Sequence, residues 1–192
     1  MKSSHPPQRR TRRLRSTIIG GLATVVFFVF YLMFLERKNT EIEAYYQHLR
    51  AENPEVYLER VAELKGFKTY VEAFSKMHDY HQPKREAPPF LVGRWRLFAE
   101  PKNVNETYFP VSCPSGVEIE DGHVKFFGLA RAFGLADGIH GVRYQIAGMA
   151  VKLLLDDGKA VPLTMVSYGT HLHHLEIIPP GAHQTYHGYL CK

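Results

Sequence analysis

The stretch VEIEDGHVKF, residues 117–126, decides the fold of this chain. Apolar and polar residues alternate on both sides of a central Asp-Gly, a dipeptide that favours a two-residue hairpin turn. A turn at this point pairs Val117 with Phe126 on one face. On the other face it pairs Glu118 with Lys125, which carry opposite charges. Because both faces match, the sequence predicts an antiparallel β-hairpin with one buried face.

The period-two pattern extends outward from this hairpin over residues 90–192. A second hairpin turns at Gly148-Met149, and a last hairpin joins residues 171–178 to residues 183–191. The pattern gives eight candidate strands, each able to pair with the next, which predicts an antiparallel up-and-down barrel. The residues expected to face inward are Leu91, Trp95, Leu97, Val117, Ile119, Val124, Phe126, Val142, Tyr144, Ile146, Val151, Leu153, Leu155, Leu175, Ile177 and Tyr186.

Upstream of the barrel, residues 36–82 have the apolar spacing of a helical stalk. Asn53 and Pro54 match a helix N-cap followed by proline at the first helical position, and Gly66 matches a break. We expect the stalk to pack on its own domain. The alternative is contact with a second copy of the chain, as a homo-oligomer, or with a partner helix. Residues 83–89 are rich in proline and are expected to form a linker.

Residues 17–35 have the composition of a transmembrane helix. The run at residues 18–35 contains no charge, and its eighteen residues, at about 1.5 Å each, match the hydrocarbon thickness of a bilayer. A cleavable signal peptide is the alternative. The run is long for such a peptide, and no small-residue cleavage site follows it.

The positive charge of the chain is concentrated before this segment. The net charge is +5, yet the residues after Lys38 include sixteen basic and eighteen acidic side chains. A basic tail at residues 1–16 favours a cytoplasmic N-terminus and contact with membrane lipid, and it argues against nucleic-acid binding. A single-pass membrane protein is then expected, with its C-terminal domain periplasmic or extracellular.

Cys113 and Cys191 are the two cysteines, and both fall in the domain expected outside the cytosol. An oxidising compartment favours a disulfide between them. In a plain meander the two residues start far apart, so the segment at residues 100–112 must fold back for the bond to form.

Residues 90–97, FLVGRWRL, resemble the Gly-x-Trp first strand of lipocalin-like (calycin) domains, and the segments at 120–127 and 186–190 fit the same outline. The resemblance implies a barrel in which Gly93 and Trp95 close one end and which often holds a small apolar ligand. The fold class expected is thus a transmembrane helix, an α-helical stalk and an all-β antiparallel eight-stranded lipocalin-like barrel.

A barrel of this size either is filled by its own side chains or holds one small ligand. The inward residues here are large, which favours a filled interior. The candidate residues for a ligand in the interior are Trp95, Phe126, Tyr144, His173 and Tyr186. A cavity above about 300 Å³ would favour the ligand hypothesis.

Histidines gather in the last hairpin. With its turn at residues 179–182, His174 faces His187, and Glu176 lies one step along on the same face. Two imidazoles and a carboxylate are zinc ligands, and a pH-responsive patch is another alternative. Because the opposite face is apolar, we expect the histidine face to be exposed and to bind no metal with useful affinity. His174→Ala would then change stability by less than about 0.5 kcal/mol.

The sequence contains no nucleophile elbow, phosphate loop or spaced carboxylate pair. We therefore expect a non-enzymatic protein that needs no cofactor. Its barrel is expected to bind another envelope membrane protein, as an assembly or signalling accessory. The alternatives are a sensor that binds a small apolar ligand, and a metal-dependent hydrolase that uses the terminal histidines.

Overall fold

The computed structural model describes the backbone of residues 9–102 and 108–192, and the side chains of residues 24–102 and 108–192. Two compact units follow one another, Met1–Pro54 and Glu55–Lys192. Among the described residues, the first unit holds one helix, α1 (Arg9–Glu52), and the second holds two helices and a barrel. Of the predicted basic tail, residues 1–8 lie outside the described residues, and residues 9–16 are helical within α1.

The transmembrane helix predicted over residues 17–35 is corrected by the structure. In the described part of the chain, no helix is long and apolar enough to cross a membrane. The uninterrupted apolar run described in α1 covers residues 25–35, and these eleven residues cover roughly 16 Å, against about 30 Å for a bilayer core. The side chains of residues 17–23, which completed the prediction, lie outside those described.

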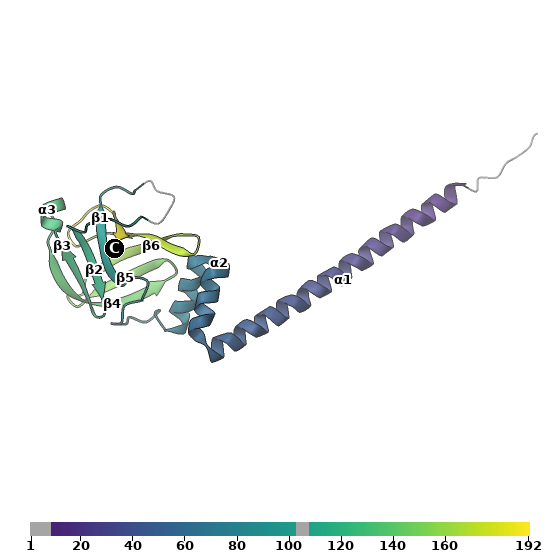
Figure 1. The fold of residues 1–192 in the computed structure, drawn as a ribbon, viewed down its shortest axis with the longest axis horizontal. Coiled ribbons are helices and arrows are strands. Elements are labelled where there is room, and N and C mark those ends of the chain that lie inside the picture. The colour runs from purple at the N-terminus through teal and green to yellow at the C-terminus, as the bar shows by residue number, and fades with distance from the viewer. Residues whose placement is uncertain (1–8, 103–107) are drawn as a thin grey trace, which may run out of the picture. The chain divides into compact units, whose positions relative to one another are not determined.

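The second unit is built on a closed antiparallel barrel in which each strand pairs with the next and the last pairs with the first (Figure 1). The predicted eight-stranded barrel is therefore confirmed. Its strands are β1 (Gly93–Phe98), β2 (Gly116–Glu120), β3 (His123–Phe127), β4 (Gly138–Ala147), β5 (Ala150–Leu155), β6 (Ala160–Tyr168), β7 (His171–Ile177) and β8 (Tyr186–Leu190).

The hairpin that decides the fold has the register that its sequence predicts, with Val117 opposite Phe126 and Glu118 opposite Lys125. The predicted turn at Gly148-Met149 also joins β4 to β5 as expected. The predicted register of the last hairpin is wrong by two residues, because β7 ends at Ile177 and the connection to β8 is longer than the predicted turn. His187 consequently lies opposite Glu176 and not opposite His174.

Large side chains fill the interior of the barrel. Every residue predicted to face inward is buried, and the same core includes Val161, Leu163 and Met165 of β6. The indole nitrogen of Trp95 donates a hydrogen bond to the carbonyl oxygen of Leu91 at 2.8 Å, which satisfies its one polar atom inside the barrel end. The prediction of a filled interior is therefore confirmed for the body of the barrel.

Helix α2 (Pro54–Met77) packs on the barrel (Figure 1). Gly66 interrupts it with φ 83°, a value that favours glycine, and this break lets the amide of Phe67 donate to the carbonyl oxygen of Gly169 at 3.1 Å. Beyond the break, Val71 and Phe74 join the barrel core. The second part of the predicted stalk is thus a helix that covers one end of its own domain.

The segment predicted as a linker, residues 83–89, is held against the barrel by its backbone. Lys84 and Tyr144 exchange two backbone hydrogen bonds, of 2.9 and 2.6 Å, so the segment adds an isolated bridge to β4. The amide of Ala87 donates to Asp121 at 2.8 Å. These bonds fix the path from α2 into β1.

One short helix, α3 (Leu129–Phe133), does not follow from the sequence pattern. The carboxylate of Asp137 accepts hydrogen bonds from the amides of Gly128, Leu129 and Ala130, which holds the first turn in place. Leu129 is buried, and α3 lies at the end of the barrel away from α2 (Figure 1).

Cys113 and Cys191 form a disulfide with their Cα atoms 6.4 Å apart, as predicted. The described parts of the connection between β1 and β2, residues 99–102 and 108–115, lie in part against the outer face of β8. There the rings of Phe98, Tyr108 and Tyr189 lie in contact, and the amide of Lys102 donates to the Tyr189 hydroxyl at 2.9 Å.

The buried tyrosines predict how stability depends on alkaline pH. Burial, with the carboxylates of Glu86 and Asp121, raises the pKa of Tyr80 to about 12. The unfolded chain ionises its tyrosines near pH 10, so it loses protons that the folded chain retains. The free energy of unfolding should be unaffected by this group below pH 10 and should fall as the pH rises toward 12. Urea unfolding at about pH 9 and pH 11 measures the change.

Tyr80→Phe is the control for this effect. It removes the hydrogen bond that the hydroxyl donates to the carbonyl oxygen of Glu86 at 3.1 Å, and it also removes the titrating group. The variant should therefore start less stable but lose less stability between the two pH values. An equal loss in both proteins would contradict the assignment.

Candidate functional site: an end cavity and a histidine cluster

A cavity of about 520 Å³ lies at the α2 end of the barrel. Residues far apart in the sequence meet there: α2, the entry to β1, the segment before β2, the β6–β7 turn and the end of β8. The lining residues are Ala62, Phe67, Tyr70, Phe90, Trp95, Tyr108, Phe109, Thr170, His171, Leu172, His173 and Leu190. Its volume is in the range of small-molecule sites.

Aromatic rings form the wall on the side of α2. The ring centroids of Phe67 and Phe90 lie 5.7 Å apart in an edge-to-face arrangement, and those of Tyr70 and Phe90 lie at the same distance. Edge-to-face contacts of this kind hold rings in defined orientations. Trp95, whose indole is fixed by its bond to Leu91, contributes the barrel side of the cavity. The site therefore presents rigid, flat apolar surfaces.

Polar groups gather on one part of the lining. Thr170, His171 and His173 come from the β6–β7 turn and the start of β7, and Tyr70 comes from α2. Burial raises the pKa of Tyr70, so its hydroxyl is a neutral hydrogen-bond donor at neutral pH. A few convergent polar groups on an apolar lining are typical of sites that orient a small ligand.

The candidate interior residues divide into two groups. Trp95 and His173 line the cavity. Phe126, Tyr144 and Tyr186 are buried in the packed core, where Tyr144 donates its hydroxyl hydrogen bond to the carbonyl oxygen of Glu120. A ligand would therefore lie at the end of the barrel and not along its axis.

No protein family, curated protein or solved structure matches the chain. The resemblance to lipocalin-like domains thus depends on the strand order and on the residues around Trp95. Any function has to be argued from the geometry of the sites themselves.

A second hollow, of about 610 Å³, lies between α2 and the segment that leads into β1. Four carboxylates, those of Glu55, Glu59, Glu86 and Asp121, contribute to its lining. Of these, Asp121 already accepts a hydrogen bond from the amide of Ala87. Carboxylates around a hollow do not by themselves identify a ligand, and the lining beside Trp95 is more apolar, so the cavity beside Trp95 is the stronger candidate.

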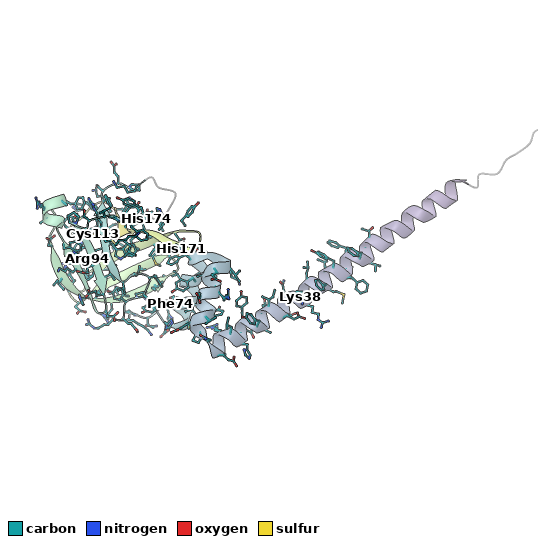
Figure 2. The ribbon with its side chains drawn as sticks, in the orientation of Figure 1. Lys38, Phe74, Arg94, Cys113, His171 and His174 are labelled. Carbon is teal, nitrogen blue, oxygen red and sulfur yellow. A yellow bond between two sulfur atoms is a disulfide. The ribbon has the colours of Figure 1, made fainter. Side chains whose placement is uncertain are left out.

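Histidines form a separate cluster on the outer face of β7 and β8. His174 and His187 lie on this face with Glu176, and the exposed fraction of His174 is 8%. The prediction that this histidine face is exposed is wrong for His174. Its ring stacks on Tyr189 at 5.2 Å, and Tyr189 is itself covered by the segment that leads to Cys113. His171 lies closer to α2 than His174 does in the view of Figure 2.

The electrostatics of the cluster keep His174 neutral. Burial lowers the pKa of His174 to about 4, and the neighbouring His173 and His187 lower it in the same direction. The Nδ1 atoms of His173 and His174 lie 2.8 Å apart, so one of these nitrogens carries the proton and donates it to the other. His174 therefore offers a neutral imidazole at neutral pH.

Sequence reasoning named His173 as a candidate ligand residue, but it missed the end cavity that His173 lines and the contact of His173 with His174. A bulge between Val166 and Ser167 shifts the pairing of β6 with β7 and leaves His173 without an opposite residue. This displacement is what allows one side chain to reach both the cavity and His174. The high histidine content of residues 171–174 was the signal in the sequence, but it does not reveal the bulge.

Proposed function

We propose that the barrel domain binds a small, mainly apolar molecule in the cavity beside Trp95. The observation that carries the proposal is an apolar cavity of about 520 Å³ with rigid aromatic walls and polar groups at one part of its lining. Its volume exceeds the roughly 300 Å³ at which a ligand site becomes the better explanation than a packing defect. The occupant we favour is a flat molecule of about two rings with one hydrogen-bonding group.

The lining supports this choice of occupant. Phe67, Phe90 and Trp95 present ring faces and edges, against which an aromatic or alicyclic molecule packs better than a flexible chain. The hydroxyl of Tyr70 and the imidazole of His171 provide a donor and an acceptor for one polar group. The lipocalin-like resemblance of the first strand implies a ligand inside the barrel, whereas this cavity lies at the end that Trp95 closes, so the proposal rests on the geometry of the cavity.

The protein partner expected from the sequence stays a competing hypothesis. The disulfide favours an oxidising compartment, such as the periplasm or the cell exterior, for the barrel domain. In that compartment a ligand-dependent change at α2 would be a means to signal to another envelope protein. A ligand site is the more specific hypothesis, because named residues build it.

Titration with anilinonaphthalene sulfonate, an aromatic probe of apolar cavities, tests the proposal. Trp95 is the only tryptophan, and it lines the cavity, so energy transfer from Trp95 to the probe reports binding to the barrel domain, and a variant of the cavity lining locates the probe. Ala62 also lines the cavity, from α2. Ala62→Phe should fill part of the volume and weaken probe binding by roughly ten-fold or more, which is about 1.4 kcal/mol.

Leu64→Phe is the matched control. It adds an aromatic ring to the same helix at an exposed position, so it should leave the affinity unchanged within about two-fold. Probe binding that is absent from the wild-type chain, or that is equal in Ala62→Phe and wild type, would refute the ligand site. Capture of a protein partner by both variants would then favour the competing hypothesis.

A further inference from the structure

We propose that His174, Glu176 and His187 form a binding site for a divalent transition-metal ion of the zinc class. The site lies on the outer face of β7 and β8 and is separate from the proposed ligand cavity. Two imidazoles and a carboxylate are a ligand set that zinc accepts, with a fourth position left for water or another group.

The strand pairing brings the three side chains together. Glu176 on β7 lies directly opposite His187 on β8, and His174 precedes Glu176 by two residues on the same face. One potential ligand atom from each residue lies within 4.8 Å of the other two. A rigid two-stranded platform of this kind holds ligands more precisely than a loop does.

The potential ligand atoms of the three residues lie close together but do not bond to one another. Oε1 of Glu176 lies 4.0 Å from Nε2 of His174 and 3.9 Å from Nδ1 of His187. Both distances are too long for hydrogen bonds. Around zinc, with bonds of about 2.0–2.1 Å, tetrahedral ligand atoms lie roughly 3.4 Å apart, so small side-chain rotations would complete the site.

His187 provides the independent observation. Its Nδ1 atom is buried and makes no hydrogen bond to any protein group that the structure describes. A buried nitrogen without a partner is costly, and native proteins rarely leave one. This nitrogen lies 3.9 Å from the Glu176 carboxylate, and an ion between the two would satisfy it.

His174 has the supporting contacts that a metal ligand needs. Its Nδ1 atom is engaged by Nδ1 of His173 at 2.8 Å, which leaves Nε2 as the nitrogen that faces Glu176. A hydrogen bond to the other ring nitrogen is the usual way in which proteins orient a ligating histidine. Tyr189 stacks on the ring at 5.2 Å and fixes its plane. Burial and outer contacts, neither of which the local sequence pattern predicts, are both present.

Zinc titration of the full chain, after treatment with a chelator, tests the proposal. Calorimetry should show one zinc ion per chain, and cobalt in its place should give the visible absorption of a low-coordinate site. Glu176→Gln and His187→Gln should each weaken zinc binding by at least about ten-fold. Removing a residue that only hydrogen-bonds to a metal ligand already lowers metal affinity by about ten-fold or more, and these two residues are ligands themselves. Glu176 is partly exposed, so its variant should keep the fold.

His183→Gln is the matched control, because His183 is an exposed histidine from the same hairpin connection. It should bind zinc within about two-fold of the wild type. Near-ultraviolet circular dichroism checks that each variant is folded. If His187→Gln does not fold, the zinc affinity of Glu176→Gln alone decides the result. The proposal is overturned if the wild type takes up no stoichiometric zinc. It is equally overturned if Glu176→Gln matches the wild type, or if His183→Gln loses as much affinity.

The two proposals can fail separately. Ala62→Phe changes the cavity at α2 and should leave zinc binding intact, whereas Glu176→Gln should leave probe binding intact. His173 is unsuitable for either test because it lines the cavity and also contacts His174.

Discussion

Replacing Cys113 and Cys191 together by serine should lower the free energy of unfolding of the barrel by about 4 kcal/mol. The disulfide joins residues 78 positions apart, and closing a loop of this length restricts the unfolded chain by roughly that amount. The bond also holds the segment that carries Tyr108 and Phe109, which line the cavity. Urea unfolding measures the loss of stability, and probe titration should show weaker binding in the same variant.

The wild-type chain in a strong reducing agent is the control for this experiment. It should lose the same stability as the double variant, since both lack the cross-link. The double variant should not respond to the reducing agent. A loss below about 1 kcal/mol would mean that the cross-link contributes little, and the chain-entropy argument would then be wrong.

The second large effect is expected at Trp95. Its side chain is buried at the end of the barrel, and Trp95→Ala should lower the free energy of unfolding by about 3–5 kcal/mol. Part of this loss comes from the carbonyl oxygen of Leu91, which loses the hydrogen bond that the indole donates. Circular dichroism during urea unfolding measures the change, because the variant has no tryptophan fluorescence.

Trp95→Phe separates packing from hydrogen bonding at this position. It keeps an aromatic ring but removes the indole nitrogen, so it should cost less than the alanine variant, about 1–3 kcal/mol. Equal losses in the two variants would show that ring packing contributes little there. That result would contradict the view that Trp95 closes the end of the barrel.

Much of the barrel could be predicted from its sequence, because the alternation of apolar and polar residues along a strand is a local property. The pairing of residues 117–126 follows from an Asp-Gly turn and two matching faces, and the inward set follows from the same alternation. In the last hairpin the predicted register was wrong by two residues. A shift of two keeps each side chain on its face, so His174, Glu176 and His187 still lie together.

Features that depend on distant residues could not be predicted in this way. The cavity is built from α2, from Trp95 and from the β6–β7 turn, which only the closed fold brings together. The burial of His174 depends on Tyr189 and on the segment that the disulfide holds in place. No local pattern encodes either arrangement. The predicted transmembrane helix was a composition argument, and the described part of α1 does not support it.

Nuclear magnetic resonance of the full chain during titration with anilinonaphthalene sulfonate tests the central claim most directly. Trp95 gives the only indole N–H signal, and its ring lines the cavity. We predict saturable shifts of this signal and of the methyl groups of Leu172 and Leu190, with little change at the core residue Leu153. Shifts confined to the second hollow, at Leu58 and its neighbours, or an unchanged Trp95 signal at saturation, would contradict a ligand site in the end cavity.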